Sequence, residues 1–355
     1  MISPKPFLLS AVVFFATAAT ASALPKAPGA FTVKVFAGAP SHAASAPDDI
    51  TMLNGHVFVA WQNGVGPTGK PAGSTSLLVE YGHSGKVVAN WPLAGRIDGI
   101  AATSEAIVAT VNEDGNSSLY TVKPGGPKSG QVVHYTYLPA PDSAGNSAVH
   151  TGGGTDAVSI LGNKILIAAS APTHKGRTAT FRAVLTRVKG MPVARLSATF
   201  SDNAHATDAL TGNRVKLHLT DPDSSAIVPA AGVFPGEYML SGQADNELIF
   251  AHGVGSGPTT LTRLQLTYGV NSTPAGVDDV RWAPVDGSTL YVVDSQAKKI
   301  YRVKGPFTAG EALASMDHVG SKSLGTQVAT LNDGSGELAP FLTGLKSAKG
   351  LLFTH

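Results

Sequence analysis

The stretch VDDVRWAPVDGSTLYVVDSQAKKIYRVKG, residues 277–305, predicts three short strands separated by two turns. Two aspartates open a brief extended run at Val280–Trp282, and Pro284–Gly287 has the composition of a turn. Thr289–Val293 is β-branched and aromatic, while Lys299–Val303 alternates polar and apolar side chains. Because no helical periodicity interrupts the stretch, it predicts an all-β structure.

Variants of this unit recur along the chain, roughly 50 to 70 residues apart, and each predicts about four short antiparallel strands. Such a repeat is typical of a β-propeller, in which each sheet buries its faces only when the ring closes. The markers of the repeat openings are Asp49, Asp98, Asp156, Asp223, Asp279 and Lys349. We therefore expect a single domain over residues 24–355 with six four-stranded blades. Five or seven blades remain open, and a β-sandwich is the competing all-β fold.

Two expectations about connectivity follow from this repeat. The unit at 277–305 is expected to form the fifth blade, completed by Thr326–Leu331 and Leu338–Thr343 after an excursion at Pro306–Lys322. The ring is expected to close by pairing the N-terminal strand Phe31–Gly38 with the C-terminal strand Lys349–Phe353 in one blade.

Residues 1–23 have the features of a secretory signal peptide. Lys5 provides a positive start, Phe7–Ala19 is almost wholly apolar, and Ala21-Ser22-Ala23 is a cleavage signal. The apolar run is shorter than the roughly 20 residues of a membrane span. We expect a secreted or periplasmic protein without a membrane span.

The composition excludes several classes of function. Cysteine is absent, so disulfides, thiolate metal sites and cysteine nucleophiles play no part. Charged residues are 14% of the chain and the formal net charge is +2, without a cluster of Lys and Arg, which argues against a nucleic-acid partner. The chain also lacks the G-x-S-x-G motif of serine hydrolases.

The repeat openings resemble a known group of propellers. Ile97-Asp98-Gly99-Ile100, the run 277–282 and the second strand Leu290–Ser295 look like those of NHL-repeat and gluconolactonase/regucalcin-like six-bladed propellers. In that family a glutamate, asparagines and an aspartate hold a channel metal for lactone hydrolysis, with a further aspartate as general base. The resemblance places Asp98 and Asp279 at ligand-type positions. This chain, however, has Pro47-Asp48-Asp49 where the family has its glutamate, and no opening has the expected asparagine.

In a propeller the opening residues of the innermost strands converge on the central channel. Carboxylates gathered there would suit calcium or magnesium, so we identify a candidate metal site, with Ca²⁺ as the candidate cofactor. The competing interpretation is structural, because an aspartate ahead of a strand can accept backbone N–H bonds from its own turn. The candidate ligands are Asp49, Asp98, Asp156, Asp223 and Asp279.

The loops after the second strands are expected at the same channel mouth. Their polar and aromatic residues form the candidate binding set: Trp61, Asn63, Asn112, His174, Gln243 and Asp294. Trp61 stands beside Gln62-Asn63 and could stack on a sugar or peptide. No residue is assigned a catalytic role.

Two functions follow from these observations. The first is a scaffold that binds a small molecule, a carbohydrate or a protein at the channel mouth and through the loops at Ala140–Gly154 and Pro306–Lys322. The second is a divalent-cation-dependent lactonase or esterase. The sequence favours the first, because the glutamate and asparagine positions of the enzyme family are not reproduced.

Overall fold

The computed structural model describes residues 23–126, 130–140, 154–172 and 176–355, and every regular element within these ranges is a β-strand. The all-β prediction is confirmed. The described residues contain no helix that could cross a membrane. The predicted signal peptide up to residue 22, His174 and most of the predicted loop Ala140–Gly154 lie outside the described residues.

The first two repeats fold as predicted, each as four antiparallel strands in chain order. The first comprises β2 (Pro47–Leu53), β3 (His56–Trp61), β4 (Thr75–Tyr81) and β5 (Val87–Ala94). The second comprises β6 (Ile97–Ala102), β7 (Ile107–Val111), β8 (Ser118–Val122) and β9 (Val132–Leu138). Strands such as β7 are buried along their whole length, because neighbouring sheets cover both faces.

The next two repeats carry small additions. β10 (Thr155–Leu161), β11 (Lys164–Ala169), β12 (Thr178–Val188) and β13 (Met191–Ser201) join the second repeat through a parallel pairing of β13 with β9, which makes one eight-stranded sheet. β16 (Pro222–Ile227), β17 (Tyr238–Gly242), β18 (Glu247–His252) and β19 (Thr260–Gln265) follow, and β14 (His205–Asp208) and β15 (Arg214–Lys216) extend their outer edge.

The opening stretch does not form one blade, so that prediction was wrong. β21 (Thr273–Trp282) pairs with β24 (Ala312–Val319), which lies in the predicted excursion, and the sheet continues with β26 (Gln327–Asn332) and β27 (Glu337–Thr343). Two short strands, β20 (Thr267–Tyr268) and β25 (Lys322–Ser323), complete this sheet. The hairpin of β22 (Thr289–Asp294) and β23 (Lys299–Lys304) belongs instead to the neighbouring sheet. Both β22 and β24 are short buried strands, so local sequence could not decide which of them pairs with β21.

The last sheet joins the two ends of the chain. Its order is β1 (Thr32–Gly38), β23, β22 and β28 (Ala348–Thr354). The terminal strands therefore share one sheet, as predicted, but β22 and β23 separate them, so the expected direct pairing was wrong. Phe36 and Tyr291 of this sheet pack against Trp61 and Tyr81 of the first repeat and close the ring with a buried aromatic cluster.

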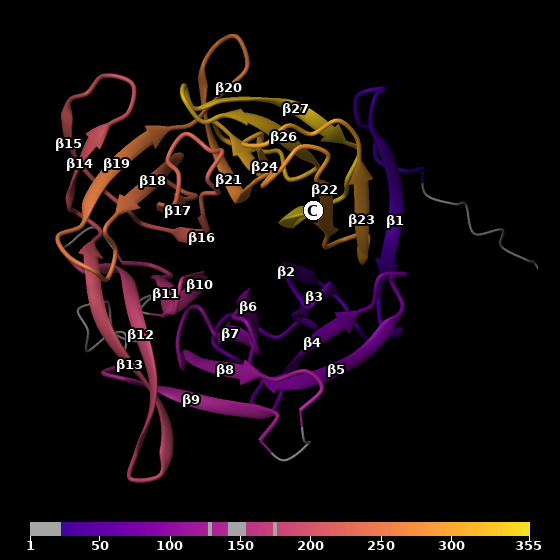
Figure 1. Cartoon of the computed structure of the whole chain (residues 1–355), viewed down its shortest axis with the longest axis vertical. Coiled ribbons are helices and arrows are strands. Elements are labelled where there is room, and N and C mark those ends of the chain that lie inside the picture. Colours follow the sequence, from indigo (N-terminus) through magenta and orange to yellow (C-terminus); the bar gives the residue numbers. More distant parts are fainter. Residues whose placement is uncertain (1–22, 127–129, 141–153, 173–175) are drawn as a thin grey trace, which may run out of the picture.

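The sheets form a propeller-like ring around a central axis (Figure 1). The innermost strands contact one another in a closed series, β2, β6, β10, β16, β21, β28 and again β2. This arrangement brings the opening residues of all the repeats to one channel.

Candidate functional site

The innermost strands share one irregularity, and it shapes the channel. The pairing register of β2 shifts between Pro47 and Ile50, and β6, β10, β16, β21 and β28 shift at the matching position. Such a bulge leaves residues out of the ladder and redirects their side chains. The first residue freed by each bulge, called here a ring position, is Asp48, Asp98, Asp156, Asp223, Asp278 or Lys349.

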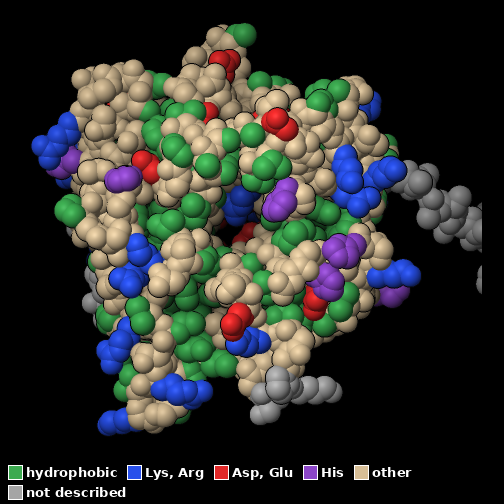
Figure 2. Space-filling model, in the orientation of Figure 1, with side chains coloured by type: hydrophobic (Ala, Val, Ile, Leu, Met, Phe, Trp, Pro, Cys, Tyr) green, Lys and Arg blue, Asp and Glu red, His purple; other side chains and the backbone are tan. Residues whose placement is uncertain are grey.

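All these side chains line one cavity of about 60 Å³ on the axis of the ring. Figure 2 shows it as a central hollow with acidic and basic side chains inside. A water molecule needs on the order of 10–15 Å³ on this scale. The cavity therefore has room for a few waters or one small charged group, and a larger ligand would have to remain at the mouth.

Carboxylates outnumber cations in this cavity. Its lining contains eight acidic side chains, namely Asp48, Asp49, Asp98, Glu113, Asp156, Asp223, Asp278 and Asp279, and three basic ones, namely Arg96, Arg281 and Lys349. Burial raises the pKa of Asp48 to about 6 and that of Asp49 to about 7. Burial, reinforced by neighbouring carboxylates, raises the pKa values of Asp98, Asp156 and Asp223 well above the usual range.

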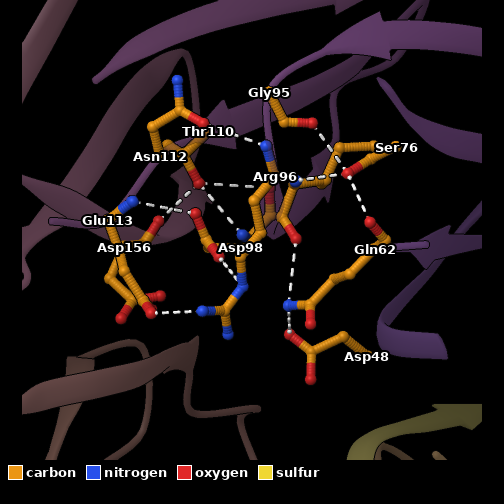
Figure 3. A network of polar contacts seen from close by, with 12 residues as sticks. Asp48, Gln62, Ser76, Gly95, Arg96, Asp98, Thr110, Asn112, Glu113 and Asp156 are labelled. Atoms are coloured by element: carbon orange, nitrogen blue, oxygen red, sulfur yellow. Dashed lines mark hydrogen bonds and ion pairs between the residues drawn. The ribbon is translucent and has the colours of Figure 1, made fainter. Parts of the chain in front are cut away.

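Arg96 organises one side of the channel (Figure 3). Its Nη1 lies 2.6 Å from Glu113 Oε1, and its Nε lies 3.0 Å from Asp98 Oδ1 without the alignment of a hydrogen bond. The Glu113 backbone N–H donates to Asp98 Oδ2 at 3.0 Å. Asn112 lies in a left-handed turn with φ 66°, and its Oδ1 accepts a hydrogen bond from the Arg96 backbone N–H at 2.9 Å. The predicted binding residue Asn112 thus orients the channel arginine.

Asp49 and Asp279, unlike the residues at the ring positions, bind backbone N–H groups of two strands. Each accepts the N–H of the next residue and a second N–H from the neighbouring innermost strand: Asp49 from Ile100 and Asp279 from Leu351, both at 2.7 Å. Asp279 also forms an ion pair with Arg281 at 2.5 Å. These two carboxylates connect adjacent blades, which is the structural role that the sequence left open for such aspartates.

Lys349 occupies the ring position of β28, where the other strands have aspartate. Its half-buried ammonium forms an ion pair with Asp278. The Asp278 carboxylate is the main reason that the pKa of Lys349 lies well above its usual value, and Asp48 and Asp223 add to the effect. The channel thus contains a cation supplied by the chain itself.

These residues do not form a cage for the divalent metal that the resemblance implies. Within the described ranges, no group of three His, Asp or Glu side chains is arranged to hold a metal ion. Asp49 and Asp279 are engaged with backbone N–H groups, and Lys349 lies among Asp48, Asp223 and Asp278. The calcium site therefore stays a prediction.

The predicted mouth residues serve mainly to hold the framework. Asn63 accepts the Ser45 backbone N–H at 3.1 Å in a left-handed turn, and Asp294 accepts those of Lys346 and Ser347 at 2.9 and 3.0 Å. Trp61 is 0% exposed and lies in the core, so its ring is not placed to stack on a ligand.

Gln243 is the predicted mouth residue that reaches a ring carboxylate. It donates to Asp223 Oδ2 at 3.0 Å, and Gln62, which we did not predict, donates to Asp48 Oδ2 at 2.8 Å. Both glutamines therefore supply donors to carboxylates that line the channel.

Sequence reasoning placed Asp48 and Asp278 among the strand openings of the channel but left them out of the candidate ligands, and it missed Arg96, Glu113 and Arg281. All five line the cavity. A signal for the ring positions was present. Aligning the openings on Ile50 and Ile100 matches Asp48, rather than Asp49, with Asp98. Nothing in the local sequence indicated that the arginines face the channel.

No family model matches the chain, and no curated protein matches it either. Among solved structures, it is similar to a candidate gluconolactonase at 13% identity and a TM-score of 0.47, over 91% of this chain and 84% of that one. A Lactobacillus plantarum protein has 8% identity and a TM-score of 0.47, with 88% and 89% covered. A Bacteroides caccae protein of unknown function has 10% identity and a TM-score of 0.46, with 87% and 86% covered. We draw neither a family nor an activity from these likenesses.

Proposed function

We propose that this protein is an exported, six-bladed propeller that acts as a binding scaffold, and that its acidic channel receives a cationic group of the ligand or partner. The observation that carries the proposal is the excess of carboxylates over cations in one small cavity. An ammonium or guanidinium group fits both the size and the charge of this cavity, while the rest of the ligand contacts the mouth.

The cavity carboxylates that form no ion pair within the described residues stand on β2, β10 and β16. The cavity cations form their ion pairs with Asp98, Glu113, Asp278 and Asp279, none of which belongs to these strands. Asp156 is 5% exposed, and its neighbours Glu113, Asp223 and Asp98 all raise its pKa. Next to them, burial and further carboxylates raise the pKa of Asp221 to about 6. A cationic ligand placed here would relieve this repulsion.

Titration calorimetry with putrescine and agmatine tests the proposal, since these probes present an ammonium and a guanidinium group. We expect saturable binding that is lost in Asp156→Asn. The matched control is Glu105→Gln, which removes one charge at an exposed ion pair outside the channel and should bind like the parent protein. Absence of binding by both probes, or equal binding by both variants, would contradict the proposal.

Hydrolysis of a lactone or ester is the second candidate. The observation that favours it is the contact of Glu113 with Asp156, because burial raises both pKa values and a raised carboxyl pKa suits general acid–base catalysis. A screen of lactones and aryl esters, with Asp156→Asn as the control, tests this candidate. Turnover that survives in the variant would exclude a role for this carboxyl pair.

A further inference from the structure

One of the six ring positions differs in charge from the other five. The matching bulges of the innermost strands place aspartate at the ring position of β2, β6, β10, β16 and β21, but β28 has Lys349 there. The register makes Lys349 equivalent to the aspartates in backbone position and opposite to them in charge.

The Lys349 ammonium interacts with carboxylates from three different strands. It is paired with Asp278 of β21, which is 8% exposed, and it lies within the electrostatic influence of Asp48 of β2 and Asp223 of β16. Lys349 lines the same cavity as Asp48, Asp223 and Asp278, so its side chain faces the channel. The ammonium therefore lies in the channel, paired with Asp278, in a cavity that carboxylates of two further strands also line.

Close backbone packing fixes the position from which the Lys349 side chain enters the channel. A Cβ added to Gly350 would lie 2.7 Å from the Asp48 carbonyl oxygen and 3.0 Å from Asp49 Cα, so β28 runs directly against β2 at this point. This close approach places the Lys349 side chain between β2, which carries Asp48, and β21, which carries Asp278.

We propose that Lys349 is the resident cation of this channel, in the role that a divalent metal would otherwise fill, and that its removal converts the ring into a metal-binding site. Without the ammonium, Asp278 loses its ion-pair partner, and Asp48 and Asp223 lose a neighbouring positive charge. Arg96 and Arg281 stay paired with the other cavity carboxylates Asp98, Glu113 and Asp279. Ca²⁺ binds through several carboxylate and carbonyl oxygens. The described carboxylates are not arranged as a metal cage beside Lys349, and loss of the ammonium would let those that line the cavity converge on the ion. The inference does not depend on any ligand of the proposed scaffold.

The test compares Lys349→Met, a neutral side chain of similar length, with Lys346→Met as the matched control. Lys346 is exposed, lies three residues away and is absent from the cavity lining. Ca²⁺ binding is measured by titration calorimetry, and the Tm is measured with Ca²⁺ and with a chelator. We expect no Ca²⁺ response in the parent protein or in Lys346→Met. In Lys349→Met we expect saturable Ca²⁺ binding and a rise in Tm of roughly 2–4 °C or more.

A second variant separates the charge from the shape of the side chain. Lys349→Arg keeps a cation in the channel and should remain unresponsive to Ca²⁺. The inference is overturned if the parent protein binds Ca²⁺ as tightly as Lys349→Met, or if Lys349→Arg gains the same binding. It is also overturned if Lys349→Met shows no Ca²⁺ response, whether it folds or stays unfolded with and without the ion. Amine binding by the parent protein is measured separately, so the scaffold proposal can fail without affecting this result.

Discussion

Asp48 and Asp49 are adjacent residues of the same type in the same strand, and both line the channel cavity, yet their carboxylates have different partners. Asp48 is a ring position that lines the channel and receives a side-chain donor from Gln62. Asp49 accepts backbone N–H groups from its own strand and from Ile100 of the next blade. Asp278 and Asp279 repeat the division, because Asp278 pairs with Lys349 while Asp279 accepts the Leu351 N–H. Because of the bulge, one short Asp-Asp motif both connects two blades and places a carboxylate at a ring position.

The largest loss of stability is expected when a carboxylate that connects two blades, called here a joining carboxylate, is removed. Asp279→Ala leaves Arg281 without its ion pair and the buried Leu351 N–H without an acceptor. We expect a loss of about 3–5 kcal/mol in the free energy of unfolding, the usual cost of breaking a buried pair. Urea unfolding measures it. Asp49→Ala removes the same kind of N–H acceptor without a direct ion pair and should cost about 1–3 kcal/mol. A loss below that of Asp49→Ala would show that the Arg281 pair does not stabilise the fold.

A second prediction concerns the blades that lack a joining carboxylate. Gly99 follows the ring position Asp98, and a Cβ there would lie 2.9 Å from both Ala157 Cα and the Asp156 carbonyl oxygen. Gly99→Ala should therefore cost about 1–3 kcal/mol through overpacking, measured by thermal or urea unfolding. Gly257→Ala is the control, because a Cβ there would have no atom within 4 Å. Equal stability of the two variants would mean that the strands can separate at no cost.

The pH dependence of stability separates the ring from ordinary surface carboxylates. The pKa of Asp48 is about 6 in the folded protein against an ordinary value of 3.8, so the folded state binds the proton more tightly than the unfolded state. The contribution of Asp48 to stability should therefore decrease as pH rises from about 4 to about 6. Denaturation of the parent protein and of Asp48→Asn across this range measures the difference. An unchanged slope in the variant would contradict the raised pKa.

The smallest effect on stability is expected for Asp156→Asn. Asp156 forms no ion pair within the described residues, and its carboxylate neighbours raise its pKa. The variant should stay within about 1 kcal/mol of the parent protein in urea unfolding, in contrast to Asp279→Ala. A loss as large as that of Asp279→Ala would give Asp156 a joining role and remove the distinction between the two kinds of aspartate.

The sequence predicted the all-β class and most strands, because alternation and turn residues are local properties. It also predicted that the carboxylates Asp98, Asp156 and Asp223 stand at strand openings, and the structure brings them into one cavity. It could not show that β22 and β23 leave the sheet of β21, because that choice depends on contacts between distant segments. The bulge decided which residue of each Asp-Asp pair takes the ring position, and a bulge depends on pairing rather than on composition.

The most direct test of the account is a calorimetric titration of the protein with putrescine at pH 6 and pH 8, in two buffers of different ionisation enthalpy. We predict saturable binding that is tighter at pH 8 and releases protons, because burial raises the pKa of Asp49 to about 7 and that of Asp221 to about 6, and a cationic ligand favours the ionised form of the channel carboxylates. Binding should be lost in Asp156→Asn and kept in Glu105→Gln. Binding that is absent, or that neither depends on pH nor changes in Asp156→Asn, would contradict an acidic channel built to receive a cation.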